Sequence, residues 1–259
     1  MAVVLQRSAV RMAGPDARSY LQSMVSNDVE ALQPGAGIYA LLLTPKARII
    51  ADLDIFDLGE ELVVAGPSEC RDDVLAALIR SRFRRKVEIA PSEHAVVWRS
   101  PDGCLARMET PAGTEGLLAV APEQREPLDA WEVARVEAGM PRFGREFGGD
   151  SMPAESGLEE RAISFTKGCY PGQEPVARLH YRGHANRGLR GLRFSDGRLP
   201  AAGAAVRAGD REVGRVGTAV VSPAFGPIAL AVLRREVEDG AEVDAGGVTA
   251  RAEQLPFRG

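Results

Sequence analysis

The stretch Lys167-Gly168-Cys169-Tyr170-Pro171-Gly172-Gln173-Glu174 decides how this 259-residue chain is interpreted. Two glycines and a proline within eight residues predict a loop instead of a periodic core segment, and loops carry functional groups more often than packing groups. A cation two positions before Cys169 favours the thiolate, which is the nucleophilic and metal-binding form of cysteine. Cys169, supported by Lys167, is therefore the first candidate functional residue. Nucleophile, redox sensor and single metal ligand all stay open as its role.

The other interpretation of an intracellular cysteine is a small apolar filler of the core, which we expect for Cys70 and Cys104. The three cysteines are odd in number and far apart, which argues against a disulfide framework and against a CxxC metal or redox pair. We therefore expect no metal site built from this chain alone. A cysteine hydrolase would also need a base, for which His180 and His184 are the nearby candidates.

Lysine is rare in this sequence, because nearly all of the 32 basic residues are arginines. The lysines are Lys46, Lys86 and Lys167. Lysine offers a compact ammonium whose pKa responds to its surroundings, whereas arginine offers a planar fork of donors. A lysine where arginine is the usual cation therefore points to a specific role for Lys167.

Downstream of the octapeptide, basic residues alternate with apolar ones at Arg178, His180, Arg182 and His184. A period of two predicts a strand with one basic face. That face would attract an anionic ligand or partner, or it is an ordinary solvated surface. The formal net charge of -4 speaks against a general nucleic-acid binder.

The wider pattern predicts an α+β fold with antiparallel sheets. Apolar stripes at helical spacing occur from Tyr20 to Val25, from Val74 to Phe83 and within Pro127 to Ala138, with short strands between them. From Gly191 the texture changes to short strands and turns, which predicts a small β-barrel. We predict a body over residues 1–190, with one module at roughly 45–120, and a barrel over 191–259. No apolar run is long enough to span a membrane, and no signal peptide is visible, so we expect a cytoplasmic protein.

Two groups of acids stand near turns. Asp52 and Asp54 alternate on one strand, so they share a face. Glu137 follows Arg135 at the end of a predicted helix. Taken alone, each acid is more often an ordinary exposed residue.

The octapeptide resembles the signature of YgfZ-type proteins of the GcvT-like aminomethyltransferase superfamily, which reads Lys-Gly-Cys, an aromatic residue, a variable position, then Gly-Gln-Glu. Pro171 fills the variable position, which is usually Thr or Ile. Further stretches over nearly the whole chain look like the superfamily, including Ser26 to Val29, Ala40 to Phe56 and Arg135 to Gly144. The resemblance implies a ring of two α/β modules and a C-terminal β-barrel around a central channel that binds tetrahydrofolate.

The same resemblance implies site residues. In related aminomethyltransferases the acid of Arg-x-Glu-Ala-Gly binds the pterin ring, and Glu137 matches it. Tyr170, Gln173 and Arg178 are further candidate folate contacts. Those enzymes also carry paired acids where this chain reads Ala51-Asp52, so only Asp52 remains as a candidate to position a one-carbon unit.

The resemblance implies a tetrahydrofolate-binding accessory protein in iron-sulfur cluster assembly or repair, with tetrahydrofolate or a one-carbon derivative as cofactor. Iron-sulfur enzymes or assembly proteins would be transient partners, because one cysteine does not supply the thiolates of a stable cluster. The alternative is a folate-dependent aminomethyl- or methyltransferase that uses Asp52. Whether the protein is an enzyme therefore stays open. We expect neither nucleic acid nor membrane as partner.

Overall fold

The computed structural model describes residues 2–99 and 101–258. The chain forms two compact units. The first comprises Met1–Leu128 and Glu159–Ala177, and the second comprises Asp129–Leu158 and Arg178–Gly259.

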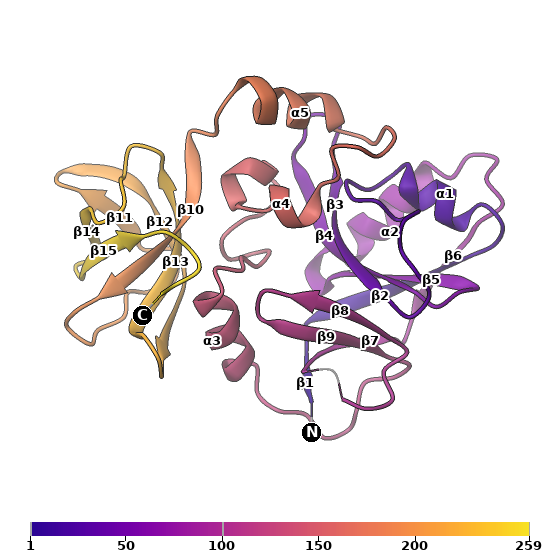
Figure 1. The fold of residues 1–259 in the computed structure, drawn as a ribbon, viewed down its shortest axis with the longest axis horizontal. Coiled ribbons are helices and arrows are strands. Elements are labelled where there is room, and N and C mark those ends of the chain that lie inside the picture. Colours follow the sequence, from indigo (N-terminus) through magenta and orange to yellow (C-terminus); the bar gives the residue numbers. More distant parts are fainter. Residues whose placement is uncertain (1, 100, 259) are drawn as a thin grey trace. The chain divides into compact units, whose positions relative to one another are not determined.

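The first unit is built on two antiparallel sheets (Figure 1). The larger has the order β3-β4-β5-β2-β6, with β2 (Arg7–Ala13), β3 (Gly37–Leu43), β4 (Ile49–Asp57), β5 (Glu61–Pro67) and β6 (Glu88–Ser92). The smaller has the order β1-β7-β9-β8, with β1 (Val3–Val4), β7 (Ala95–Trp98), β8 (Ala106–Thr110) and β9 (Gly113–Leu118). Strand β4 is buried along almost its whole length, so it forms the core of the larger sheet and fixes the position of the acids it carries.

Short helices complete this unit: α1 (Ala17–Gln22), the 3-10 turn η1 (Ser68–Cys70), α2 (Arg71–Arg80) and α4 (Glu159–Ala162). Helix α1 buries Tyr20 and Leu21, and α2 buries Val74 and Leu78. The Tyr20 hydroxyl donates a hydrogen bond of 2.5 Å to the carbonyl of Leu78. The two apolar stripes visible in the sequence therefore face the same core.

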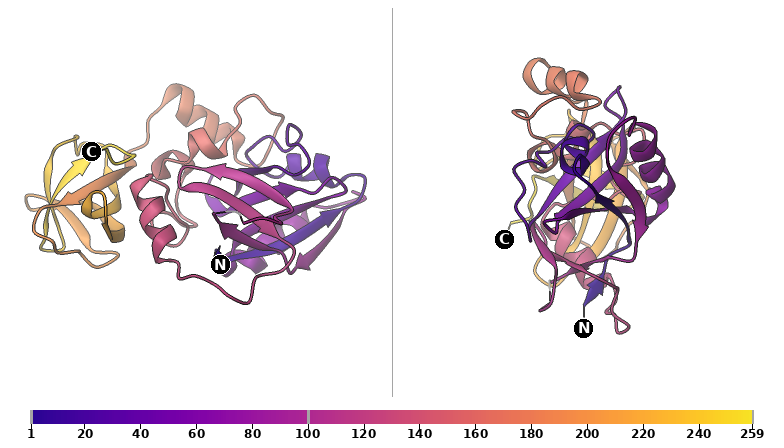
Figure 2. Two further views of the ribbon diagram at one scale, coloured as in Figure 1. Left: turned by 60° about the horizontal axis from the view of Figure 1, so that its bottom comes forward. Right: turned by 90° about the vertical axis from the view of Figure 1, so that its right-hand side faces the viewer.

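The second unit contains a closed six-stranded barrel with the order β10-β13-β12-β11-β14-β15. Its strands are β10 (Arg187–Phe194), β11 (Ala205–Ala208), β12 (Arg211–Ser222), β13 (Gly226–Arg234), β14 (Glu242–Ala245) and β15 (Thr249–Glu253). Figure 2 shows these strands from two further directions. Small and branched side chains such as Val206, Val216 and Ala252 fill its interior.

Helix α3 (Asp129–Glu137) and the 3-10 turn η2 (Pro153–Ser156) belong to the same unit. Val136 of α3 packs in one apolar cluster with Ile228, Leu230 and Phe257. The C-terminal end of α3, where Glu137 lies, is therefore held against strand β13 of the barrel.

The predicted α+β class, its antiparallel sheets and its C-terminal barrel are confirmed. The ring around a channel stays a prediction, as does the domain boundary at residue 191. Among the described residues, no helix combines the length and the hydropathy needed to cross a membrane.

The predicted basic strand around Arg178 to His184 is wrong, because Gln173–Arg182 form helix α5. Val176 is the residue that this helix buries, while Arg178, His180 and Arg182 are all exposed. Pro175 lies in the first turn, where a helix tolerates proline because that N–H has no partner within the helix. The alternation of charge therefore arose on a helix, where a period of two does not divide the residues between two faces as it does on a strand.

Candidate functional site

The segment between α4 and α5 carries the first six residues of the octapeptide, Lys167 to Gly172, and is hydrogen-bonded to a distant part of the chain. The Ser164 N–H donates to the carbonyl of Ser26 at 3.0 Å. The Lys167 N–H donates to the Ser164 hydroxyl at 3.2 Å. Both contacts place the Lys167–Gly172 segment, called the motif loop below, against the turn that follows α1.

Lys167 anchors the motif loop, and its ammonium group is buried. Its Nζ donates to the carbonyls of Val25 at 2.6 Å and Asn27 at 3.0 Å, and also to that of Gln22 at the end of α1. Burial lowers the pKa of Lys167 to about 8, against the opposing effect of Asp28 and Glu30. Three hydrogen bonds to carbonyls make Lys167 a structural residue of the loop. Its support for a Cys169 thiolate stays a prediction.

Gly172 anchors the other end of the motif loop. It has φ of 85°, and a Cβ there would lie 2.6 Å from the carbonyl oxygen of Thr44 and 3.1 Å from the Cα of Ala47. Only glycine combines that backbone conformation with so close an approach. By contrast, a Cβ on Gly168 would meet no atom within 4 Å.

Cys169 lies between these anchors and is exposed. Cys70 is buried, and burial raises the pKa of its thiol to about 11, while Cys104 is partly buried. The structure therefore holds the loop at Lys167 and Gly172 and leaves Cys169 open to solvent. A thiol in this setting is accessible to a partner without any rearrangement of the fold.

Asp52 and Asp54 share a face of β4, as predicted, and Arg7 of β2 binds both. Arg7 Nη1 lies 2.8 Å from Asp52 Oδ2, and Arg7 Nε lies 2.6 Å from Asp54 Oδ2. Burial raises the pKa of Asp54, and the Arg7 cation opposes that change. The Tyr39 hydroxyl also donates to Asp52 Oδ2 at 3.1 Å.

One oxygen of this acid cluster remains without a partner. Asp52 Oδ1 is buried and makes no hydrogen bond among the described residues. The guanidinium of Arg161 stacks 3.8 Å from the centre of the Tyr39 ring, and its Nη1 and Nη2 are likewise buried without a hydrogen-bond acceptor. Sequence reasoning missed Arg7, Tyr39 and Arg161, because nothing local marks a partner 45 residues away in the chain.

In the second unit, Glu137 is partly buried at the end of α3. The Ser222 hydroxyl donates to Glu137 Oε1 at 2.5 Å and accepts the N–H groups of Ala224 and Phe225. Among the described residues, Oε2 of Glu137 has no hydrogen-bond donor. Ser222 therefore fixes one oxygen of the carboxylate and leaves the other able to accept from a ligand.

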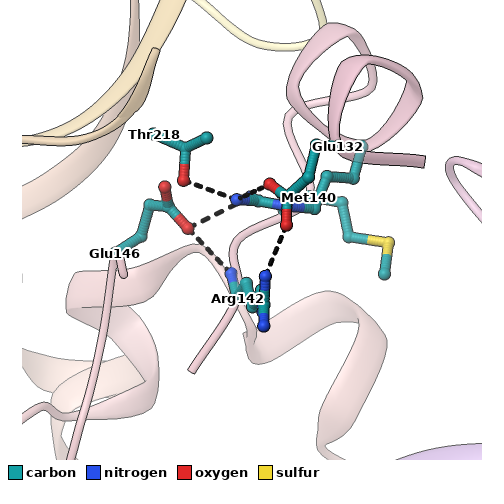
Figure 3. A network of polar contacts seen from close by, with 6 residues as sticks. Glu132, Met140, Arg142, Glu146 and Thr218 are labelled. Atoms are coloured by element: carbon teal, nitrogen blue, oxygen red, sulfur yellow. Dashed lines mark hydrogen bonds and ion pairs between the residues drawn. The ribbon is translucent and has the colours of Figure 1, made fainter. Parts of the chain in front are cut away.

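Two residues before Glu137, Arg135 forms the centre of a buried cluster that sequence reasoning also missed (Figure 3). Its guanidinium is 0% exposed and lies 2.6 Å from Glu132 and 3.2 Å from Glu146. Arg135 also donates to the Met140 carbonyl at 3.1 Å and to the Thr218 hydroxyl at 2.5 Å. The cluster, called the arginine cluster below, joins α3, the loop after it and β12.

The remaining predicted residues lie in or beside α5. Tyr170 is buried, burial raises the pKa of its phenol to about 12, and its ring centre is 5.3 Å from Lys167 Nζ. Gln173 is the first residue of α5 and is partly buried, whereas Arg178 is exposed. The structure brings Lys167 and Tyr170 together. The folate contacts of Tyr170, Gln173 and Arg178 stay predictions.

Comparison with known proteins adds to this geometry. Residues 4–98 match the model of the GCVT N-terminal domain, and residues 186–257 match that of the CAF17 C-terminal β-barrel domain. Over 238 residues the chain is 31% identical to the mitochondrial iron-sulfur cluster assembly factor IBA57 of Homo sapiens, which covers 76% of this chain and 67% of that protein. The chain belongs to the IBA57 and YgfZ family.

A second relative and a solved structure are also similar to the chain. The tRNA-modifying protein YgfZ of Pectobacterium carotovorum is 29% identical over 231 residues, which cover 74% of this chain and 69% of that protein. The crystal structure of the glycine cleavage system aminomethyltransferase T from Bartonella henselae superposes with a TM-score of 0.84. The match covers 99% of this chain and 86% of that one at 17% identity, which shows a shared fold.

The resemblance drawn from the octapeptide is thus confirmed at the level of the family and of the GcvT-like fold. In the described part of the chain, no group of three or more His, Cys, Asp or Glu side chains lies in a geometry able to hold a metal ion. The compartment and the absence of a nucleic-acid partner stay predictions.

Proposed function

We propose that this member of the IBA57 and YgfZ family is a tetrahydrofolate-binding accessory factor in iron-sulfur cluster assembly or repair. The observation that carries the proposal is the exposed Cys169 on a loop anchored by Lys167 and Gly172. The family supports the same direction, since its human member is named as an iron-sulfur cluster assembly factor. Its partners would be iron-sulfur enzymes or their assembly proteins.

Glu137 suits the pterin ring of the folate. The amino-pyrimidine edge of a pterin presents N–H donors, and an ionised carboxylate accepts such donors strongly. Glu137 Oε1 is oriented by Ser222, which leaves Oε2 to accept from the ligand. The residues therefore fit the group, and a bound tetrahydrofolate would supply a carrier for one-carbon units.

Cys169 would contact the iron-sulfur cluster. Stable clusters need several thiolates, usually four, and Cys70 is buried. A single exposed thiol therefore meets a cluster only transiently, with the remaining ligands supplied by the client protein. Lys167 acts through the loop, because its ammonium binds carbonyls that lie 140 to 145 residues away in the chain.

The folate half is tested by calorimetric titration of the full chain with tetrahydrofolate. We expect saturable binding that Glu137→Gln weakens by about tenfold or more, since a charge-assisted hydrogen bond is replaced by a neutral one. Ser222→Ala should weaken binding less, and Glu238→Gln, an exposed acid of the same unit, should not change it. Binding that is absent, or equal in wild type and Glu137→Gln, would contradict this half.

The cluster half is tested in cells that lack the chromosomal gene, by assaying a [4Fe–4S] dehydratase. We expect wild type and Glu238→Gln to restore its activity, and Cys169→Ala and Cys169→Ser to fail although the variant proteins accumulate and bind tetrahydrofolate. Cys104→Ala is the matched cysteine control. Full rescue by Cys169→Ala would remove the thiol from the function.

A second function, folate-dependent aminomethyl transfer, is favoured by one observation: the buried Oδ1 of Asp52 has no hydrogen-bond donor among the described residues. The reaction would transfer the carbon of an S-aminomethyl donor onto tetrahydrofolate as a methylene group, with the carbon-sulfur and carbon-nitrogen bonds broken, and would release ammonia and the free thiol of the donor. It predicts formation of methylenetetrahydrofolate that Asp52→Asn abolishes. No turnover by the wild type, with tetrahydrofolate bound, would leave the accessory function alone.

A further inference from the structure

A cavity of about 590 Å³ lies within the second unit, and its lining includes neither Glu137 nor a residue of the motif loop. Its walls are the loop from Gly144 to Ser156 and strands β10, β12 and β13. The residues that matter for what it binds are Arg145, Glu146, Arg187, Arg215, Gly217 and Arg234. Its volume is in the range of small-molecule sites, which is about 300–1,000 Å³.

The rim of the cavity carries an unbalanced pair of like charges. Arg187 of β10 and Arg234 of β13 are direct register partners in the barrel, both are exposed, and both line the cavity. In the described part of the chain neither guanidinium forms an ion pair or a hydrogen bond. Like charges placed directly opposite on neighbouring strands destabilise a sheet. An anion bound between the two arginines would remove that repulsion.

Further arginines extend this rim. Four acids also line the cavity, Glu146, Asp150, Glu155 and Glu212, and each of them already has a partner. Arg145, on the loop side, has no side-chain partner among the residues that the structure describes. Arg215 is held at 3.0 Å by Glu212, which is itself a lining residue. Glu155, on the loop side, accepts the N–H of Met152 at 3.2 Å. The cationic groups that remain for a ligand are therefore Arg145, Arg187 and Arg234.

The inner wall offers an acceptor. Glu146 has a fully buried side chain whose Oε2 accepts from Arg135 at 3.2 Å and from the Arg142 N–H at 2.9 Å (Figure 3). Its Oε1 has no hydrogen-bond donor among the described residues. Gly217 packs directly against this carboxylate, since a Cβ there would lie 2.5 Å from Oε1, so the room left by the missing Cβ is occupied by Glu146 itself. An N–H or O–H group of a ligand would satisfy this oxygen.

We propose that this cavity binds a phosphate ester of nucleotide size, with the phosphate between Arg187 and Arg234 and a donor group of the organic part directed to Glu146. Arginine recognises phosphate through two parallel hydrogen bonds, which suits a pair of guanidinium groups on adjacent strands. A bare phosphate would leave most of the cavity empty and Glu146 Oε1 without a donor. The ligand class is thus a nucleoside monophosphate.

The test uses the full chain with AMP and GMP as probes, followed by titration calorimetry and by the thermal unfolding midpoint. We expect one of them to bind saturably and to raise the midpoint, because a ligand bound only by the folded state stabilises it. Adenosine or guanosine and inorganic phosphate, added separately, should bind at least about tenfold more weakly. Equal binding of inorganic phosphate would reduce the cavity to an anion site and overturn the proposal, as would no binding of either nucleotide at millimolar concentration.

Variants separate this binding from a structural role of the arginines. Arg187→Gln and Arg234→Gln should each weaken nucleotide binding by about tenfold or more, while each raises the unfolding midpoint of the free protein by removing the like-charge pair. Arg207→Gln, an exposed arginine on β11 outside the cavity, should leave the affinity unchanged. If Arg207→Gln weakens binding as much, or if Arg234→Gln lowers the midpoint of the free protein more than Arg207→Gln does, the assignment is wrong.

Discussion

The motif loop of the first unit and the arginine cluster of the second each bury a cation, but they compensate it differently. The Lys167 ammonium is surrounded by the carbonyls of Gln22, Val25 and Asn27, which carry no net charge. The Arg135 guanidinium meets two carboxylates, Glu132 and Glu146. Carbonyl dipoles leave the cost of burying the charge largely uncompensated, so the pKa of Lys167 falls to about 8. The stability contributed by Lys167 therefore depends on its protonation state. The stability contributed by Arg135 depends on the presence of both carboxylates.

The largest expected effect follows from removing one side of the ion pair. Arg135→Met would leave Glu146 as a buried and uncompensated carboxylate, so we expect a loss of about 3–5 kcal/mol in the free energy of unfolding. Urea denaturation followed by tryptophan fluorescence measures it, because the Trp131 ring lies 5.6 Å from the guanidinium. Arg145→Met, on the exposed part of the same loop, is the control. A loss below about 1 kcal/mol would mean that the cluster contributes no more than a surface ion pair.

Lys167→Met tests the carbonyl tie. Three acceptors lose their donor, but the part-buried carbonyls of Gln22 and Asn27 recover part of the loss by binding water, whereas that of Val25 is buried. We therefore expect a smaller decrease of about 1–3 kcal/mol in the unfolding free energy at pH 7. Lys46→Met, an exposed lysine in the turn between β3 and β4, should change stability by under about 0.5 kcal/mol. A stability equal to that of wild type would show that the buried ammonium and its carbonyls cancel.

The two glycines of the motif loop allow a packed position, Gly172, to be compared with an open one, Gly168. Gly172→Ala forces a Cβ to within 2.6 Å of the Thr44 carbonyl at a positive φ, so we expect a loss of about 1–3 kcal/mol. Gly168→Ala meets no neighbouring atom and should cost under about 0.5 kcal/mol. Thermal and urea unfolding of both variants measure these two changes in stability. If the order of the two effects is reversed, the loop is not held at Gly172.

The smallest expected effect is a pH dependence. The pKa of Lys167 is about 8 in the folded protein and 10.5 is its ordinary value, so above pH 8 the folded state loses a proton that the unfolded state keeps. Stability rises with pH wherever the unfolded state binds more protons. The unfolding free energy of wild type minus that of Lys167→Met should therefore increase by about 1 kcal/mol between pH 7 and pH 9. The difference between wild type and Lys46→Met should stay flat.

Local sequence patterns predicted those features of the fold that depend on residues close together in the chain. The alternation that put Asp52 and Asp54 on one face is confirmed, because Arg7 binds both. The same argument failed for α5, where the exposed Arg178, His180 and Arg182 alternate on a helix that buries Val176. A period in charge alone does not distinguish a strand from a helix that buries a single residue.

The hydrogen-bond partners of Lys167 could not be predicted from the residues near it in the sequence. Its carbonyl acceptors lie 140 to 145 residues earlier in the chain, so the sequence suggested a cation free to act on Cys169. The rarity of lysine did point to a specific role, and the structure identifies that role as holding the loop. The Arg135 and Glu146 pair was not visible either, because the loop between them brings the two side chains together only in the folded chain. Arg135 is itself the arginine of the Arg-x-Glu stretch that marked Glu137.

The three thiols differ in their exposure, so a chemical label can be directed to one of them. Cys70 is buried with a thiol pKa of about 11, Cys104 is partly buried, and Cys169 is open. We expect a maleimide dye to react first at Cys169, because its thiol is exposed whereas those of Cys70 and Cys104 are buried and partly buried. A fluorophore attached there, in a chain whose only change is Cys104→Ser, would report the approach of a partner to the motif loop.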